Sequence, residues 1–139
     1  MAEVQLRPDG QRLFSEDVSA NNTVALADSG VVLNQIADAL VTTLPNAATS
    51  NVGLTVIVRL AGVPKSGAPA GTGDNQSVGH EIAPHSSDKI VGMGVANAAD
   101  KSMLMVKASM EVGDYVKLRC DGVDTWFIDE VVGSWTFEA

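Results

Sequence analysis

The sequence has little cysteine and no long apolar run. One cysteine among 139 residues excludes an internal disulfide framework and a zinc site built from several cysteines. No apolar stretch approaches the roughly 18 residues of a membrane-spanning helix. The first residues lack a basic region followed by an apolar stretch, so we expect no signal peptide and a chain that folds in a reducing cytoplasm.

Positive charge is also scarce. Nine Lys and Arg residues stand against 17 Asp and Glu residues, which gives a formal net charge of -8. Nucleic acid and anionic membrane surfaces both require basic faces, so we expect neither as a partner. Hydrophobic residues make up 45% of the chain, which is typical of a globular protein with a packed core. The length corresponds to one domain.

The composition favours β-structure. Val, Ile and Thr are frequent and suit a pleated surface, and 13 glycines punctuate the chain at short intervals. Apolar residues alternate with polar ones over 54–60 and 115–120, which predicts two strands that are each buried on one face. Asp121-Gly122 then predicts a tight reversal into a hairpin whose second strand is 125–131.

The predicted strand 125–131 is apolar on both faces. Trp126 and Ile128 share one face, while Phe127 and Val131 share the other. A strand of this kind is covered on both sides, so we expect its own core on one side and a neighbouring subunit on the other. Further strands are predicted at 134–137, 23–27, 78–82, 89–91 and 103–108.

The segment 32–44 fits two structures. Leu33, Ile36, Leu40 and Leu44 lie at helical spacing, with Pro45 just beyond. The alternative is a pair of strands, 31–34 and 39–44, joined by a turn. Elsewhere we expect an N-terminal arm or hairpin over residues 1–21, an exposed Gly/Pro/Ser loop at 62–77 within a single β-domain 22–139, and no internal repeat.

No catalytic constellation emerges from the candidate residues. His80 and His85 are spaced wrongly for a zinc-protease motif, and Pro84 would break the required helix, so we expect solvated loop histidines. Cys120 shares the apolar face of its strand, which favours a buried structural thiol over a nucleophile. We therefore predict no enzyme activity, no cofactor and no metal site.

Acidic and sulfur-containing residues also group along the chain. One local acidic cluster consists of Asp121, Asp124, Asp129 and Glu130. Its spacing does not fit a calcium loop, so we expect it to form a solvated face. The late methionines are expected to fill gaps in a core or an interface.

Several short phrases, in order and spacing, resemble a small β-domain of tailed-bacteriophage virion structural proteins. They are Leu26-Ala27-Asp28-Ser29-Gly30-Val31, Val41-Thr42-Thr43-Leu44-Pro45, Gly53-Leu54-Thr55-Val56-Ile57-Val58, Gly113-Asp114-Tyr115-Val116-Lys117-Leu118, Asp121-Gly122, Thr125-Trp126-Phe127-Ile128 and Gly133-Ser134-Trp135-Thr136. The resemblance runs from about Val24 to Phe137. It implies a strand over 39–44 in place of the helix.

This resemblance implies an all-β protein, which we expect to be a jelly-roll-like sandwich or compact barrel of about eight to ten short strands. It further implies a capsid decoration, or cement, protein that binds the major capsid protein on the outside of a phage head. The alternative is a receptor- or glycan-binding module of a head or tail fibre. The chain has no coiled-coil or collagen-like shaft of the kind a fibre needs, which favours the decoration protein.

We expect the protein to act by adhesion as a homo-oligomer, most simply a trimer, on the virion surface. The expected interface residues are Val4, Leu6, Leu13, Phe14, Trp126, Phe127, Ile128 and Trp135. An arm ordered on a partner must bury its apolar groups there. Deleting residues 1–20 is therefore expected to abolish capsid binding and to leave the fold intact.

Overall fold

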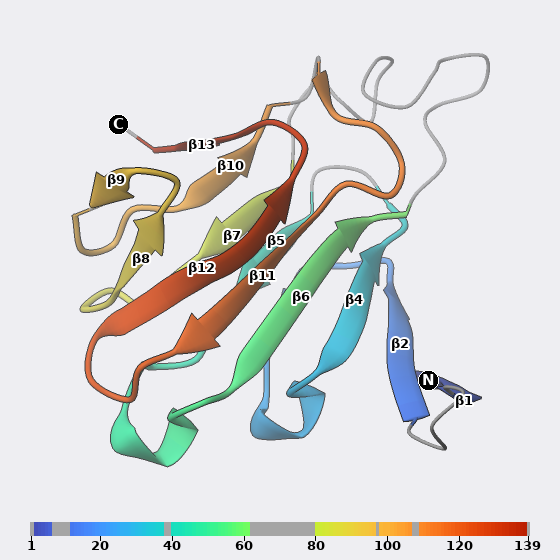
Figure 1. Cartoon of the computed structure of the whole chain (residues 1–139), viewed down its shortest axis with the longest axis horizontal. Coiled ribbons are helices and arrows are strands. Elements are labelled where there is room, and N and C mark those ends of the chain that lie inside the picture. Colours follow the sequence, from blue (N-terminus) through green and yellow to red (C-terminus); the bar gives the residue numbers. More distant parts are fainter. Residues whose placement is uncertain are drawn as a thin grey trace.

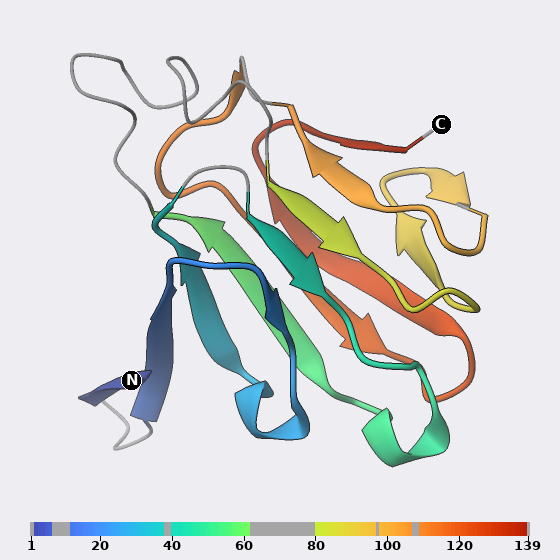
Figure 2. The ribbon, with the colours of Figure 1, turned by 180° about the vertical axis from the view of Figure 1, so that it is seen from behind.

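The strands assemble into two facing sheets (Figures 1 and 2). The computed structural model describes residues 2–6, 12–37, 40–61, 80–96, 98–106 and 109–138. The larger sheet has eight strands, in spatial order β1 (Ala2–Leu6), β2 (Arg12–Val18), β4 (Val31–Gln35), β6 (Thr55–Leu60), β11 (Tyr115–Cys120), β12 (Thr125–Val132), β8 (Lys89–Gly92) and β9 (Val95–Ala96). The smaller has five, in the order β13 (Trp135–Phe137), β10 (Met103–Met105), β7 (Glu81–Ala83), β5 (Val41–Thr43) and β3 (Asn22–Thr23).

The first half of the chain winds as a coil between the two sheets. The strands β2, β4 and β6 lie in the larger sheet as parallel neighbours, and β3, β5 and β7 lie in the smaller sheet in the same way. Each turn of the coil therefore adds one strand to each sheet. This is a structural repeat that the sequence analysis missed, because its length changes: Phe14 pairs with Val31 in one turn, and Val32 pairs with Ile57 in the next.

Two short 3-10 turns connect the sheets at one end of the coil. These are η1 (Leu26–Asp28) and η2 (Thr49–Asn51), and each leads into a glycine with φ of 77°, Gly30 and Gly53. The preceding Ser29 and Val52 have φ near −60° and ψ of 124° and 132°, which is the geometry of a type II turn. The left-handed position of that turn suits glycine, so both turns of the coil use the same device.

The second half of the chain completes the larger sheet with antiparallel pairing. The hairpin β11–β12 lies between β6 and β8, with β11 antiparallel to β6 and β12 parallel to β8. The register of the hairpin shifts between Lys117 and Leu118. An extra residue on β12 at this bulge lets Phe127 and Glu130 both face outward.

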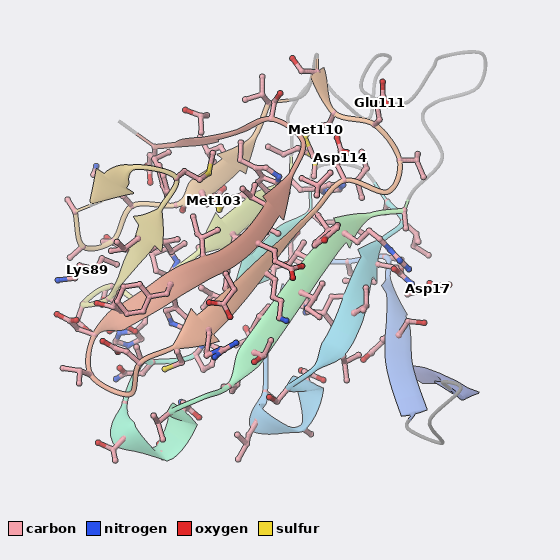
Figure 3. The ribbon with its side chains drawn as sticks, viewed as in Figure 1. Asp17, Lys89, Met103, Met110, Glu111 and Asp114 are labelled. Atoms are coloured by element: carbon pink, nitrogen blue, oxygen red, sulfur yellow. The ribbon has the colours of Figure 1, made fainter. Side chains whose placement is uncertain are left out.

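The core fills the space between the sheets. Trp126 is fully buried and Trp135 nearly so, and aliphatic residues of both sheets surround them. Met103 on β10 and Met110, both labelled in Figure 3, are fully buried. The prediction of methionines that fill gaps in a core is thus confirmed for these two residues.

The all-β sandwich expected from the sequence is confirmed, and β11 matches its predicted bounds. For 32–44 the described residues form the strand pair β4 and β5, and none of them is helical. The strand predicted at 23–27 is wrong: β3 ends at Thr23, and the Asp28 carboxylate accepts the Ala25 N–H at 2.8 Å to form the turn η1.

The topology differs from that of a jelly roll. Parallel neighbours in both sheets depart from its purely antiparallel order, and the strands exceed the eight to ten expected. The loop predicted at 62–77 lies outside the described residues.

Candidate functional site

A shallow groove of about 220 Å³ lies on the outer face of the larger sheet, the face toward the viewer in Figure 1. Alternation along the strands creates it, since Val56 and Val58 point into the core while Ile57 and Arg59 point out. We call it the outer groove, and its lining comes from β4, β6, β11 and β12: Val32, Ile57, Arg59, Tyr115, Lys117 and Glu130.

A relay of hydrogen bonds holds Arg59 in the outer groove. The Arg59 Nε–H donates to Oδ1 of Asn34 at 2.9 Å, and Nδ2 of Asn34 donates to Oδ1 of Asp17 at 3.2 Å. Figure 3 places Asp17 near the upper end of β2, so the relay crosses three parallel strands. The Nη groups of the guanidinium take no part in this relay.

A second hydrogen bond fixes the opposite side of the groove. The Tyr115 hydroxyl donates to Oε2 of Glu130 at 3.0 Å. This hydrogen bond, together with the negative charge of Glu130 and some burial, raises the pKa of Tyr115. Lys117 pairs in register with Ile57 on one side and Glu130 on the other, and forms no ion pair within the described part of the chain.

A second exposed feature lies at one end of the sandwich. Three neighbouring turns expose a large aliphatic side chain each: Leu26 at 63%, Val52 at 63% and Val123 at 75%. We call these residues the turn row, and their turns line the lower margin of Figure 1. The turns are tied together, because Ser29 Oγ accepts the Thr55 N–H and the Thr49 hydroxyl donates to the Gly122 carbonyl.

The expected interface residues of the C-terminal strands divide between core and surface. Trp126 and Trp135 are buried within this chain, and Ile128 packs against the core. The two tryptophans therefore stabilise the fold and cannot form a free surface, which corrects the expectation that they are interface residues, whereas Ile128 is only partly buried. Phe127 is 48% exposed on the outer face of β12 and remains available to a partner.

The N-terminal segment was expected to be either an arm or a hairpin, and the structure shows a hairpin. β1 pairs antiparallel with β2, and β2 pairs in parallel with β4, so the segment belongs to the larger sheet. Val4 and Leu6 lie on β1, and Leu13 and Phe14 lie on β2. The contacts of these four side chains are outside the described part of the structure.

Of the candidate catalytic residues of the sequence, neither Cys120 nor His80 lies in an environment that suits catalysis. The Cys120 thiol is buried, and this burial raises its pKa, so the thiol is unsuited to act as a nucleophile. His85 is exposed, but His80 is buried and its Nδ1 accepts the Leu40 N–H at 3.0 Å, which corrects the expectation that both are solvated. Within the described ranges no group of three or more acidic, histidine or cysteine side chains is placed to hold a metal ion.

The acidic cluster splits into separate roles. Asp121 caps the β11–β12 turn, and Asp124 lies 3.4 Å from Nζ of Lys89. Asp129 pairs with Arg119 at 2.6 Å on the outer face. Each of these carboxylates therefore has a local partner.

Burial of the Asp121 carboxyl alone would raise its pKa, but hydrogen bonds to that carboxylate reverse the effect. The backbone N–H groups of Val123, Thr125 and Asp124 donate to Oδ1 at 2.8, 3.0 and 3.2 Å. With the charge of Lys89 nearby, they lower the pKa of Asp121 below its ordinary value.

The fold and these surfaces define a two-sheet β-sandwich with a coiled first half and two candidate binding surfaces. The chain matches no protein-family model, and no curated protein matches it either. In the part of the chain that the structure describes, no helix has the length and apolar character needed to cross a membrane.

Neither candidate surface could be recognised from local sequence patterns. Alternation did place Ile57, Arg59, Tyr115 and Lys117 on the faces opposite the core, but it could not show that β6 and β11 are neighbours. The turn row had a signal, since Leu26, Val52 and Val123 each lie within four residues of a glycine. Their proximity, however, follows from the coil and from the pairing of β11 with β6.

Proposed function

We propose that the chain is an adhesive structural protein of a virion exterior, a capsid decoration protein that binds the major capsid protein. The turn row carries this proposal. Its three side chains project from turns whose backbone is held by hydrogen bonds between neighbouring turns. A rigid aliphatic surface loses little conformational entropy on binding, so most of the free energy of burying it contributes to affinity.

The choice of partner follows the resemblance of the sequence to virion β-domains. Single exposed aliphatic residues are common on soluble proteins, but three on adjacent turns at one end form a contact surface. In the proposed complex, the turn row faces the capsid. The end of β12 near the β11–β12 turn, with the exposed Phe127, then serves contacts between copies of this chain and leaves the outer groove open.

The test is binding to purified heads of the phage that encodes the chain, prepared without it. The wild-type chain should sediment with the heads, and Val123→Asp and Leu26→Asp should each weaken binding at least about tenfold, because an ion would be buried against the partner. The matched control is Val112→Asp. Val112 is also exposed, on the turn that precedes β11, at the opposite end of that strand from Val123.

Equal binding by the Val123 and Leu26 variants would rule out the turn row as the contact. Mass spectrometry of purified virions tests the wider proposal. Hundreds of copies per particle support a shell component, a handful would indicate a fibre instead, and none would remove the structural role.

A further inference from the structure

The outer groove combines three kinds of chemistry in a small space. Val32 and Ile57 form an apolar floor, Arg59 and Lys117 supply positive charge, and Tyr115 with Glu130 supplies a hydroxyl and a carboxylate. The chain carries a formal charge of -8, so a site with two cations and one anion departs from the rest of the molecule. Such a site favours a ligand with a negative charge.

The polar groups of the groove are positioned before any ligand arrives. The relay through Asn34 to Asp17 fixes the Arg59 guanidinium through Nε, and among the described residues its Nη groups have no hydrogen-bond partner. The hydrogen bond from Tyr115 holds Glu130 through Oε2 and leaves Oε1 as an acceptor. Pre-positioned groups bind with less loss of side-chain entropy.

We propose that the outer groove binds a carboxylate-bearing sugar ring, such as a uronic acid. Its carboxylate would lie between the Arg59 guanidinium and the Lys117 ammonium, one ring hydroxyl would donate to Glu130, and the C–H face of the ring would cover Ile57. This inference does not rest on the adhesive role of the turn row, which lies on a different surface.

Size and chemistry together select this ligand class. A groove of about 220 Å³ holds a single ring, and it is smaller than the pockets of drug-sized ligands. A simple carboxylate would leave Glu130 without a hydroxyl to bind, and a neutral sugar would leave Lys117 without an anion. A sugar acid satisfies both groups and the apolar floor at once.

Nuclear magnetic resonance titration of the full chain with sodium glucuronate tests the proposal. Saturable shifts of the Lys117 and Tyr115 amides are expected with a Kd of about 1 mM, as is usual for a ligand of this size. Glucose should produce no saturable shift, and raised salt should weaken glucuronate binding. An oligomer of uronic acid that binds more tightly than the monomer would identify a polysaccharide as the natural source.

The variants are chosen to separate binding from folding. Lys117→Ala should raise the Kd at least about tenfold while the melting temperature stays unchanged, because Lys117 has no ion-pair partner in the described structure. Arg119→Ala is the matched control. Arg119 lies on the same strand and face but outside the groove, and it is paired with Asp129.

Three outcomes would overturn the proposal. They are the absence of saturable shifts at ten times the expected Kd, equal binding of glucose, and tighter binding of a hexaglutamate peptide, which would assign the groove to an acidic protein segment. These measurements use the isolated chain. Failure here therefore leaves the capsid proposal untouched, and failure to bind heads leaves this one untouched.

Discussion

Buried polar side chains complete the backbone hydrogen bonding where strand pairing ends. His80 accepts the Leu40 N–H, and Oδ2 of Asp88 accepts the Ala47 N–H at 2.6 Å. All four residues are buried. Because an unpaired buried N–H costs about 1–3 kcal/mol, these side chains hold segments that the sheets do not reach. His80 is thus part of the core.

Substitution of two turn glycines by alanine tests how closely the turns are packed. Gly53 and Gly122 both have positive φ, but a Cβ on Gly53 would meet nothing within 4 Å, whereas a Cβ on Gly122 would lie 2.7 Å from that of Val52. We expect Gly53→Ala to cost about 1 kcal/mol of unfolding free energy and Gly122→Ala about 2–4 kcal/mol. Urea denaturation measures both values.

The double variant with Val52→Gly identifies the cause. Removing the Val52 Cβ should recover at least about 1 kcal/mol of the Gly122→Ala loss, measured against Val52→Gly alone, because that Cβ is the atom nearest to the new methyl group. Purely additive effects would show that the contact between these two turns does not matter.

The single tyrosine makes the outer groove accessible to titration. Glu130 raises the pKa of Tyr115 through its hydrogen bond and its charge. We expect Glu130→Gln to lower that pKa toward 10.0, the ordinary value of tyrosine. Because the chain has one Tyr, ultraviolet difference absorbance at alkaline pH reports this group directly. An unchanged titration midpoint would contradict the hydrogen bond.

At the scale of elements, the β11–β12 hairpin depends on a charged turn residue. The folded-state pKa of Asp121 is depressed, so its contribution to stability is fully present above the unfolded-state pKa of about 3.9 and is lost as pH falls through the folded-state pKa. Asp121→Asn keeps an acceptor but lacks the charge. We therefore expect it to be less stable than wild type at pH 7, with a difference that shrinks below about pH 4.

Denaturation curves of the two proteins at several pH values test this expectation. The exposed position of the turn makes the effect small, because solvent screens the charge. Asp129→Asn is the comparison variant, since Asp129 lies in the same hairpin but pairs with Arg119 and not with the turn backbone. A difference for Asp121→Asn that stays constant with pH would contradict a role for the charge.

At the scale of the whole molecule, the N-terminal hairpin is part of the larger sheet. β2 covers the edge of β4, whose residues Val31, Val32 and Leu33 are apolar. We therefore expect deletion of residues 1–20 to destabilise the fold and to promote aggregation through the exposed edge of β4. This revises the expectation that the fold survives. Thermal unfolding and light scattering test it, and a stable monomeric truncated chain would contradict it.

Self-association is a second property of the whole molecule. If the end of β12 near the β11–β12 turn joins copies, Phe127→Asp should raise the dissociation constant of the oligomer at least about tenfold, because Phe127 would lose its buried contact. Sedimentation velocity over a range of concentrations measures this, with Val112→Asp as the control. A wild-type chain that stays monomeric at high concentration would refute the contact.

The sequence by itself determined the strands whose side chains alternate between core and solvent. It gave the bounds of β11, the hairpin at Asp121-Gly122 and the buried state of Cys120, because these depend on neighbours in the chain. Where the local signals disagreed, as over 32–44, intrinsic strand preference was correct and apolar spacing was not.

Only the tertiary structure decided which strands are neighbours. The coil brings β4 and β6 together across 25 residues, and the hairpin β11–β12 then adds Tyr115, Lys117 and Glu130 beside them. Strand pairing over such separations follows from the packing of the whole core, which no local pattern encodes. For the same reason the sequence, which placed Trp126 and Phe127 on opposite faces of their strand, could not show which of the two faces meets the core.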